Sequence, residues 1–126
     1  MSPLFRRGRE AEPGKRGETL AAAFLQRKGC RVLRRNVRNR FGEIDLIVQD
    51  GDEVVFVEVK TRTSGRWGDP ATAVTPHKRK RICLAAEQIA TRGRLRGRPL
   101  RFDVITVLLG GEKPEIAHYP DAFTLR

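Results

Sequence analysis

Cysteine, methionine and large aromatic residues are scarce in this sequence. Its 126 residues include two cysteines, one methionine, one tryptophan and one tyrosine. Cys30 and Cys83 lie far apart and show neither CxxC nor Cys/His spacing, which argues against a zinc finger or a disulfide framework. We therefore expect both cysteines to be reduced thiols that pack as small apolar groups.

Long hydrophobic runs are also lacking. The longest ones, VVFVEV and DVITVLL, have the length of a β-strand and contain or adjoin acids, so we expect no membrane-spanning helix. The basic N-terminal segment is followed by no apolar stretch of the kind that secretory signals carry. These features favour a cytoplasmic protein without a membrane partner.

Acidic residues are outnumbered by basic ones. The chain carries 26 Lys and Arg against 15 Asp and Glu, a formal net charge of +11. Such a surplus attracts phosphate backbones or anionic lipid. Because neither a long apolar span nor an amphipathic anchor accompanies the charge, nucleic acid is the leading candidate partner.

The length and periodicity of the chain fit one folded domain. We expect a flexible basic arm over residues 1–13 and a single domain over residues 14–126. Apolar residues recur at helical spacing from 15 to 28, where Gly29 ends the pattern, and again after Thr75 and Pro76, an N-cap and first-turn pair. Five segments show strand patterns, at residues 30–35, 41–49, 53–61, 100–109 and 115–119. This order predicts an α/β fold with a mixed central sheet flanked by helices.

Three charged residues of the predicted hairpin form the strongest candidate site. Side chains alternate along a strand, so Glu58 and Lys60 share the face of Phe56. If the turn at Asp50-Gly51 pairs residue 45 with 56 or 58, Asp45 joins that face. The competing interpretation is a solvated strand face with an incidental Glu–Lys pair, since an isolated ExK is common.

The chemistry of such a cluster points to a metal. Two carboxylates on one face of an apolar hairpin repel each other, and a divalent cation relieves that repulsion. Asp45 and Glu58 offer the hard oxygen ligands that Mg²⁺ or Mn²⁺ prefers. Lys60 beside them is placed to orient or deprotonate a water, or to stabilise charge that develops on a phosphate.

The segment GEIDLIVQDGDEVVFVEVKTR resembles the core of the YraN-like family of bacterial proteins, which is similar to Holliday junction resolvases and other PD-(D/E)xK nucleases. The resemblance extends from residue 14 to about residue 120, with Gly14, Gly17 and Glu18 matching the helical part of the motif. It implies a restriction-endonuclease-like fold. It also implies an active site formed by the residues that match the resolvase tetrad, namely Glu18, Asp45, Glu58 and Lys60. Spacing alone favours a different interpretation of Glu18, as an exposed acid near the start of a helix.

Four basic residues are candidates for contacts with a nucleic-acid backbone. Lys78 and Arg79 lie in the first turn of the second helix, where the helix dipole favours anions, although their stems also suit an apolar surface. Arg62 follows the ExK strand directly, and Arg66 lies in the long loop after it. Trp67, next to Arg66, suits base stacking or a core-capping role.

The function that these features imply is hydrolysis of DNA phosphodiester bonds by a Mg²⁺- or Mn²⁺-dependent endonuclease, with branched or structured DNA as substrate. DNA is favoured over RNA by the resemblance. A homodimer is compatible with it, because cutting both strands of a junction needs two sites. Two alternatives stay open: a non-catalytic nucleic-acid-binding module, and an RNA- or ribosome-associated adaptor on the same fold.

Overall fold

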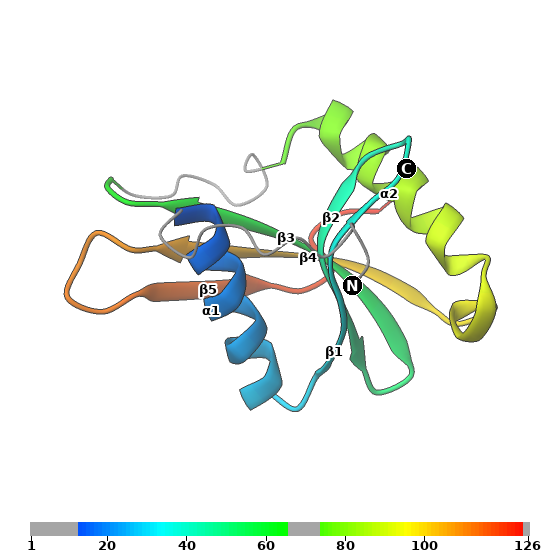
Figure 1. Ribbon diagram of the computed structural model, residues 1–126, viewed down its shortest axis with the longest axis horizontal. Coiled ribbons are helices and arrows are strands. Elements are labelled where there is room, and N and C mark those ends of the chain that lie inside the picture. Colours follow the sequence, from blue (N-terminus) through cyan, green and yellow to red (C-terminus); the bar gives the residue numbers. More distant parts are fainter. Residues whose placement is uncertain (1–12, 66–73, 125–126) are drawn as a thin grey trace, which may run out of the picture.

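The computed structural model describes residues 13–65 and 74–124, and it shows a mixed sheet with one helix on each face (Figure 1). The predicted α/β fold class is confirmed, and the arrangement is consistent with a restriction-endonuclease-like fold. The elements follow one another as α1 (Pro13–Arg27), β1 (Arg31–Arg38), β2 (Glu43–Asp50), β3 (Glu53–Arg62), α2 (Pro76–Ala90), the 3₁₀ turn η3 (Gly93–Leu95), β4 (Leu100–Leu108) and β5 (Glu115–Tyr119).

The five strands lie in the order β1-β2-β3-β4-β5. Neighbouring strands are antiparallel except β3 and β4, which run parallel. A parallel pair needs a crossover connection, and α2 supplies it. The sheet is therefore mixed, with β1 and β5 as its two edges.

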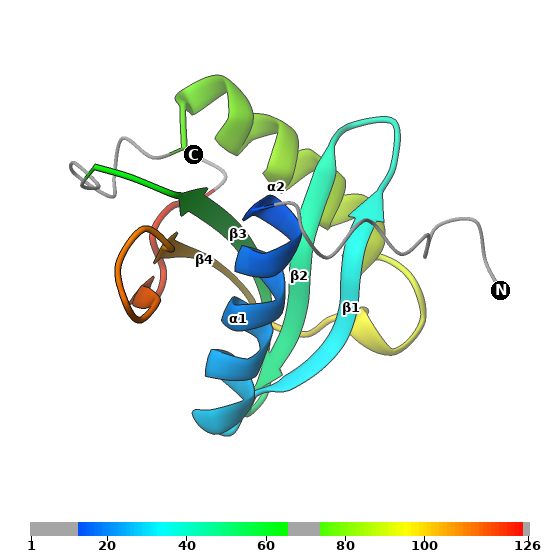
Figure 2. The ribbon, with the colours of Figure 1, turned by 60° about the vertical axis from the view of Figure 1, so that its left-hand side comes forward.

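The sheet is buried on both faces, which explains the unbroken apolar run in β3. Val55 and Val57 pack with Leu25 of α1 in one cluster, whereas Val54 and Phe56 pack with Ile82 of α2 in another. A strand that is covered on both faces has a continuous hydrophobic sequence, whereas a strand covered on one face alternates between apolar and polar residues. Figure 2 shows α1 and α2 on opposite sides of β2 and β3.

The C-terminal end of α1 and the N-terminal end of α2 lie close to where the sequence predicts them, whereas α1 begins two residues earlier than predicted, at Pro13. Gly29 adopts a φ of 94° just after α1, a conformation that glycine reaches without steric cost. Thr75 caps α2, because its side-chain oxygen accepts a hydrogen bond from the backbone N–H of Lys78. Pro76 follows as the first helical residue.

The hairpin turn differs from the prediction by one residue. β2 continues through Asp50, which pairs with Glu53, so the turn is Gly51-Asp52 rather than Asp50-Gly51. Gly51, with a φ of 60°, supplies the left-handed conformation that the turn requires. The shifted turn still gives a register that sets residue 45 against residue 58.

Other expectations from the sequence can be compared with the structure. Cys30 and Cys83 are free thiols, as predicted. In the parts of the chain that are described, no helix has the length and apolar character needed to cross a bilayer. Of the arm predicted over residues 1–13, residues 1–12 lie outside the described residues, as do Arg66 and Trp67, whereas Pro13 begins α1.

Candidate functional site

The candidate site lies where β2 and β3 separate. Their backbone pairing ends at Leu46 opposite Val57. One residue further on, the Asp45 carboxylate accepts the backbone N–H of Val59 at 2.8 Å. A side chain thus takes the place of the next ladder hydrogen bond, and it holds the Asp45 carboxylate between the two strands.

Glu58 is the most deeply buried acid of the site, with 5% of its side chain exposed. Its Oε1 atom lies 3.0 Å from Nζ of Lys78 and 3.8 Å from Nζ of Lys60. Lys60 follows Glu58 on the same face of β3, whereas Lys78 comes from the first turn of α2. The predicted trio of Asp45, Glu58 and Lys60 therefore meets at one place, joined by a second lysine.

The carboxylates of this site are electrostatically strained. Burial and the neighbouring Glu58 charge raise the pKa of Asp45 to about 8, against the lowering effect of the Val59 N–H. Burial and the adjacent Lys78 hold the pKa of Lys60 below its ordinary value. Burial works against the charged form of Lys78 too, but hydrogen bonds to Lys60 and Glu58 keep its pKa above the ordinary value.

Glu18 of α1 completes the acidic group. Burial raises its pKa, and its charge contributes to the raised pKa of Asp45. Within the described part of the chain, its Oε1 atom is buried and has no hydrogen-bond partner. Gly17 allows this placement, since a Cβ atom there would collide with Oγ1 of Thr61 in β3. The helical acid therefore belongs to the candidate site and is not simply exposed.

A hollow of about 390 Å³ opens onto the carboxylates from the side of α2. Asp45 and Glu58 line it on the sheet, and His77, Lys78 and Arg81 line it on the helix. The N-terminal end of α2 thus faces the acids, and its positive dipole end suits a negatively charged ligand in the hollow.

The other predicted contact residues occupy different surroundings. Arg62 is exposed at the end of β3, on the face of Lys60. Arg79 donates from Nε to the carbonyl of Val74 at 2.8 Å, and its guanidinium lies 5.9 Å from the Phe123 ring centroid. Arg79 thus has a structural role at the start of α2, while its phosphate contact remains a prediction.

A second buried acid lies on the opposite face of the sheet. Asp103 of β4 is fully buried and accepts hydrogen bonds from Arg101, His118 and the backbone N–H of Asp121. Arg101, two residues earlier on the same strand, forms an ion pair with it, with an Nε to Oδ1 distance of 2.8 Å. Nε2 of His118 lies 2.7 Å from Oδ2 of Asp103.

The carboxylates where β2 and β3 separate suit a hard divalent cation that keeps part of its water shell. Among the described residues no group of three or more His, Cys, Asp and Glu side chains is arranged to hold a metal ion. Asp45 and Glu58 offer two carboxylates, a number that Mg²⁺ accepts together with waters and substrate phosphate. Within residues 13–65 and 74–124, Oε1 of Glu18 has no hydrogen-bond partner, and Glu58 repels Asp45 and so raises its pKa; a bound cation would relieve both.

Comparison with known proteins gives consistent matches over most of the chain. Residues 17–107 match the model of the uncharacterised protein family UPF0102. A UPF0102 protein of Geobacter metallireducens is 46% identical over 112 residues, which cover 89% of this chain and 92% of the relative. One from Rhodococcus jostii is 48% identical over 87% of this chain and 94% of its own length. One from Syntrophus aciditrophicus is 45% identical over 97% of this chain and 96% of the relative.

Proposed function

The chain belongs to the UPF0102 family, as its YraN-like sequence motifs predict, and we propose that it is a metal-dependent nuclease that hydrolyses phosphodiester bonds in DNA. One observation carries the proposal: Asp45, Glu58 and Lys60 converge where two strands separate, beneath a hollow that the N-terminus of α2 faces. Two carboxylates and an ammonium in a hollow of this kind suit phosphoryl chemistry better than packing.

Each residue has a role that follows from its position. Asp45 and Glu58 would hold Mg²⁺ or Mn²⁺, and Glu18 would accept hydrogen bonds from its waters. The bound cation would supply Lewis-acid polarisation of the phosphate and a lower pKa for a nearby water. Lys60, 3.8 Å from Glu58, would orient the attacking water or stabilise the charge that develops on the phosphate. Lys78 compensates the Glu58 charge and lies where a phosphate oxygen would enter.

The charge of the whole chain supports a nucleic-acid substrate. A net charge of +11 favours phosphate backbones, and the basic first turn of α2 borders the hollow itself. The similarity of the family motif to Holliday junction resolvases favours DNA that is branched or otherwise structured. A homodimer with two such sites would cut both strands of a junction.

The decisive experiment separates cleavage from binding. Wild type, Lys60→Ala and Glu58→Gln are incubated with duplex, flap, fork, junction and RNA substrates in Mg²⁺ or Mn²⁺, and their affinities are measured separately in EDTA. Loss of a charge stabiliser of the transition state should lower the cleavage rate by ~10² to 10³. Affinity should change little, because each variant alters one charge of many. Lys80→Ala, an exposed lysine of α2 outside the site, is the matched control and should cleave at the wild-type rate.

The alternatives predict different results. A non-catalytic binding module would bind nucleic acid and cut no substrate beyond the level of the two variants. An RNA- or ribosome-associated adaptor would bind RNA in preference to every DNA form. Either outcome refutes the nuclease proposal, provided that circular dichroism shows the wild type to be folded.

A further inference from the structure

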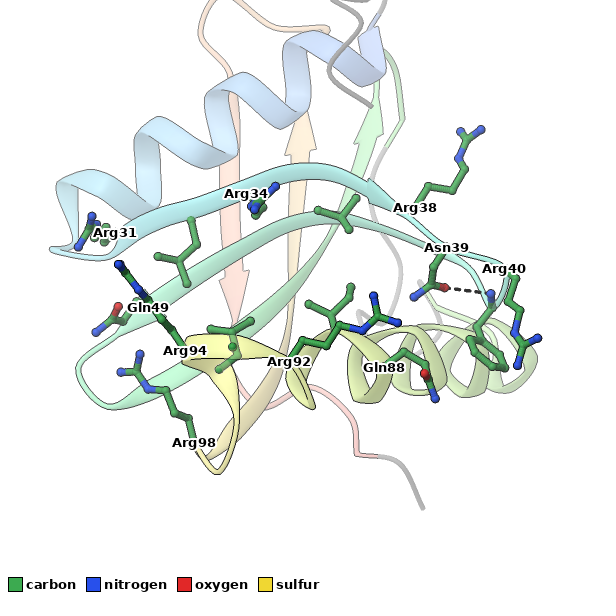
Figure 3. Close-up of a pocket in the computed structure, with 16 residues that line it drawn as sticks. Arg31, Arg34, Arg38, Asn39, Arg40, Gln49, Gln88, Arg92, Arg94 and Arg98 are labelled. Atoms are coloured by element: carbon green, nitrogen blue, oxygen red, sulfur yellow. Dashed lines mark hydrogen bonds between the residues drawn. The ribbon is translucent and has the colours of Figure 1, made fainter. Parts of the chain in front are cut away.

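An arginine-lined groove of about 870 Å³ lies beside the candidate active site, between edge strand β1 and the C-terminal part of α2 (Figure 3). Of the sixteen described residues that line it, seven are arginines and none is Asp or Glu, although Arg38 pairs with Glu43 outside the lining at 3.2 Å. β1 and the turn after it supply one side, with Arg31, Arg34, Arg38 and Arg40. The segment after α2 supplies the other side, with Arg92, Arg94 and Arg98.

This gathering of arginines is not explained by protection of the sheet edge. Charged side chains on an edge strand do prevent pairing with other sheets, which accounts for arginines in β1. It does not account for Arg92, Arg94 and Arg98, which come from a different segment and face the same groove. A guanidinium binds phosphate oxygens through a planar pair of N–H groups, so two facing rows of arginine suit a row of phosphates.

The floor of the groove is apolar. Leu33, Val37, Phe41, Ile89 and Leu95 line it and are only partly buried in the α2-side core. A duplex would present only base edges, sugars and phosphates to such a floor, because the faces of its bases are stacked inside. An unpaired strand presents base faces, which pack on apolar and aromatic side chains.

The groove and the candidate active site are held in a fixed relation by one turn. Phe41 lines the groove and Gly42 lines the acidic hollow, so the two spaces meet at adjacent residues. The Asn39 side chain accepts the N–H groups of both residues and donates to the carbonyl of Ala85 in α2. Arg81 of α2 donates from Nε to the Phe41 carbonyl at 2.9 Å.

We propose that this groove binds an unpaired strand of nucleic acid that continues from the substrate segment in the candidate active site. The inference rests on the proposed function and narrows its substrate class to DNA with a single-stranded arm, such as a flap or fork. The arginines would hold the phosphates of that arm, and the apolar floor would hold its bases.

The test measures binding in EDTA, so that it does not depend on catalysis. The probes are a fluorescent 20-nucleotide oligothymidine, an abasic strand of the same length, a blunt duplex, a duplex with one single-stranded arm, and polyglutamate. The groove variant is Arg92→Ala/Arg94→Ala/Arg98→Ala. The matched control removes three exposed cations outside the groove, as Arg27→Ala/Arg96→Ala/Lys113→Ala.

The groove variant should lose oligothymidine affinity about tenfold to a hundredfold at 0.1 M salt, with a salt slope reduced by about 2, since each single-strand phosphate contact contributes about 0.7. The control should lose much less. Wild type should bind oligothymidine more tightly than the abasic strand, and the armed duplex more tightly than the blunt one. Should the triple variant fold poorly, Arg94→Ala compared with Arg96→Ala repeats the test within one exposed segment.

Three results would overturn the proposal. Equal losses in the groove variant and the control would show that only net charge matters. Equal affinity for oligothymidine and the abasic strand would show that the floor holds no bases. Loss of polyglutamate binding with unchanged DNA affinity would identify the groove as a site for an acidic peptide. Inactivity of the wild type in the cleavage assay would refute the nuclease proposal without altering any of these binding results.

Discussion

Replacement of Asp45 by asparagine should stabilise the protein in the absence of divalent cations. The pKa of Asp45 is raised from 3.8 to about 8 in the folded state by burial and by the charge of Glu58. The folded state therefore keeps a proton that the unfolded state has released, and stability falls as the pH rises from about 4 to 8. Above this pH range the folded state bears the full free-energy cost of the charged Asp45 carboxylate, and below the range it bears none of that cost.

The magnitude follows from the size of the shift. Each unit of pKa difference corresponds to about 1.4 kcal/mol, so the carboxylate costs about 4 kcal/mol of folding free energy at pH 7. The amide that replaces the carboxylate would be neutral, and its oxygen can still accept the N–H of Val59. We expect Asp45→Asn to recover about 2–4 kcal/mol at pH 7, or about 5–15 °C in melting temperature.

The assay is thermal unfolding in EDTA at pH 5 and pH 8, followed by circular dichroism. The melting temperature of Asp45→Asn should exceed that of the wild type by more at pH 8 than at pH 5. Asp52→Asn, at the exposed hairpin turn, should show no such difference between the two pH values. With Mn²⁺ the difference in stability should narrow, because the wild type would gain about 2.7 kcal/mol at a hundred times the dissociation constant and the variant would not. A variant that melts below the wild type at pH 8, or gains equally at both pH values, would refute this account.

Two further predictions concern packing and the second buried acid. Gly17→Ala should destabilise the fold by about 1–3 kcal/mol, because its Cβ would collide with Thr61. Gly14→Ala, with nothing near its Cβ, should stabilise α1 by about 0.5–1 kcal/mol, and urea unfolding of both variants checks the contrast. Hydrogen bonds hold the pKa of buried Asp103 low, so Asp103→Asn should cost about 3 kcal/mol at pH 7. That cost should shrink as the pH falls below about 4, because the unfolded wild type then takes up a proton that the folded Asp103 resists; an undiminished cost at pH 3 would contradict it.

The sequence predicts the local elements well, because their signals are local. Gly29, Thr75 and Pro76 mark helix ends through their own backbone preferences, and these ends are confirmed. The exact turn of the hairpin was wrong by one residue, since both Asp50-Gly51 and Gly51-Asp52 suit a tight turn. Asp45 still shares a face with Glu58, because moving a two-residue turn by one position changes the partner of residue 45 by two residues, from 56 to 58, and residues two apart on a strand point to the same face.

The sequence predicts less where distant segments meet. The contact of Lys78 with Glu58 depends on how the β3–α2–β4 crossover sets the first turn of α2 over the end of β3. The arginine groove likewise depends on two segments, 31–40 and 92–98, that are far apart in the sequence. Nothing in either segment alone indicates that they lie side by side. Charge count alone indicates an affinity for phosphate, but only the fold concentrates the charge in one groove.

The two buried acids of the sheet show how a functional carboxylate differs from a structural one. Asp103 accepts four hydrogen bonds from three partners, two of them cationic or ring N–H donors, and its pKa is lowered. Asp45 accepts a backbone N–H from Val59 and otherwise faces Glu58, and its pKa is raised. The fold supplies Asp103 with four hydrogen bonds, so packing alone does not explain why Asp45 is buried beside a second carboxylate, that of Glu58. The strain at Asp45 is therefore best explained by a ligand that the site binds, because local inconsistencies of this kind concentrate at functional sites.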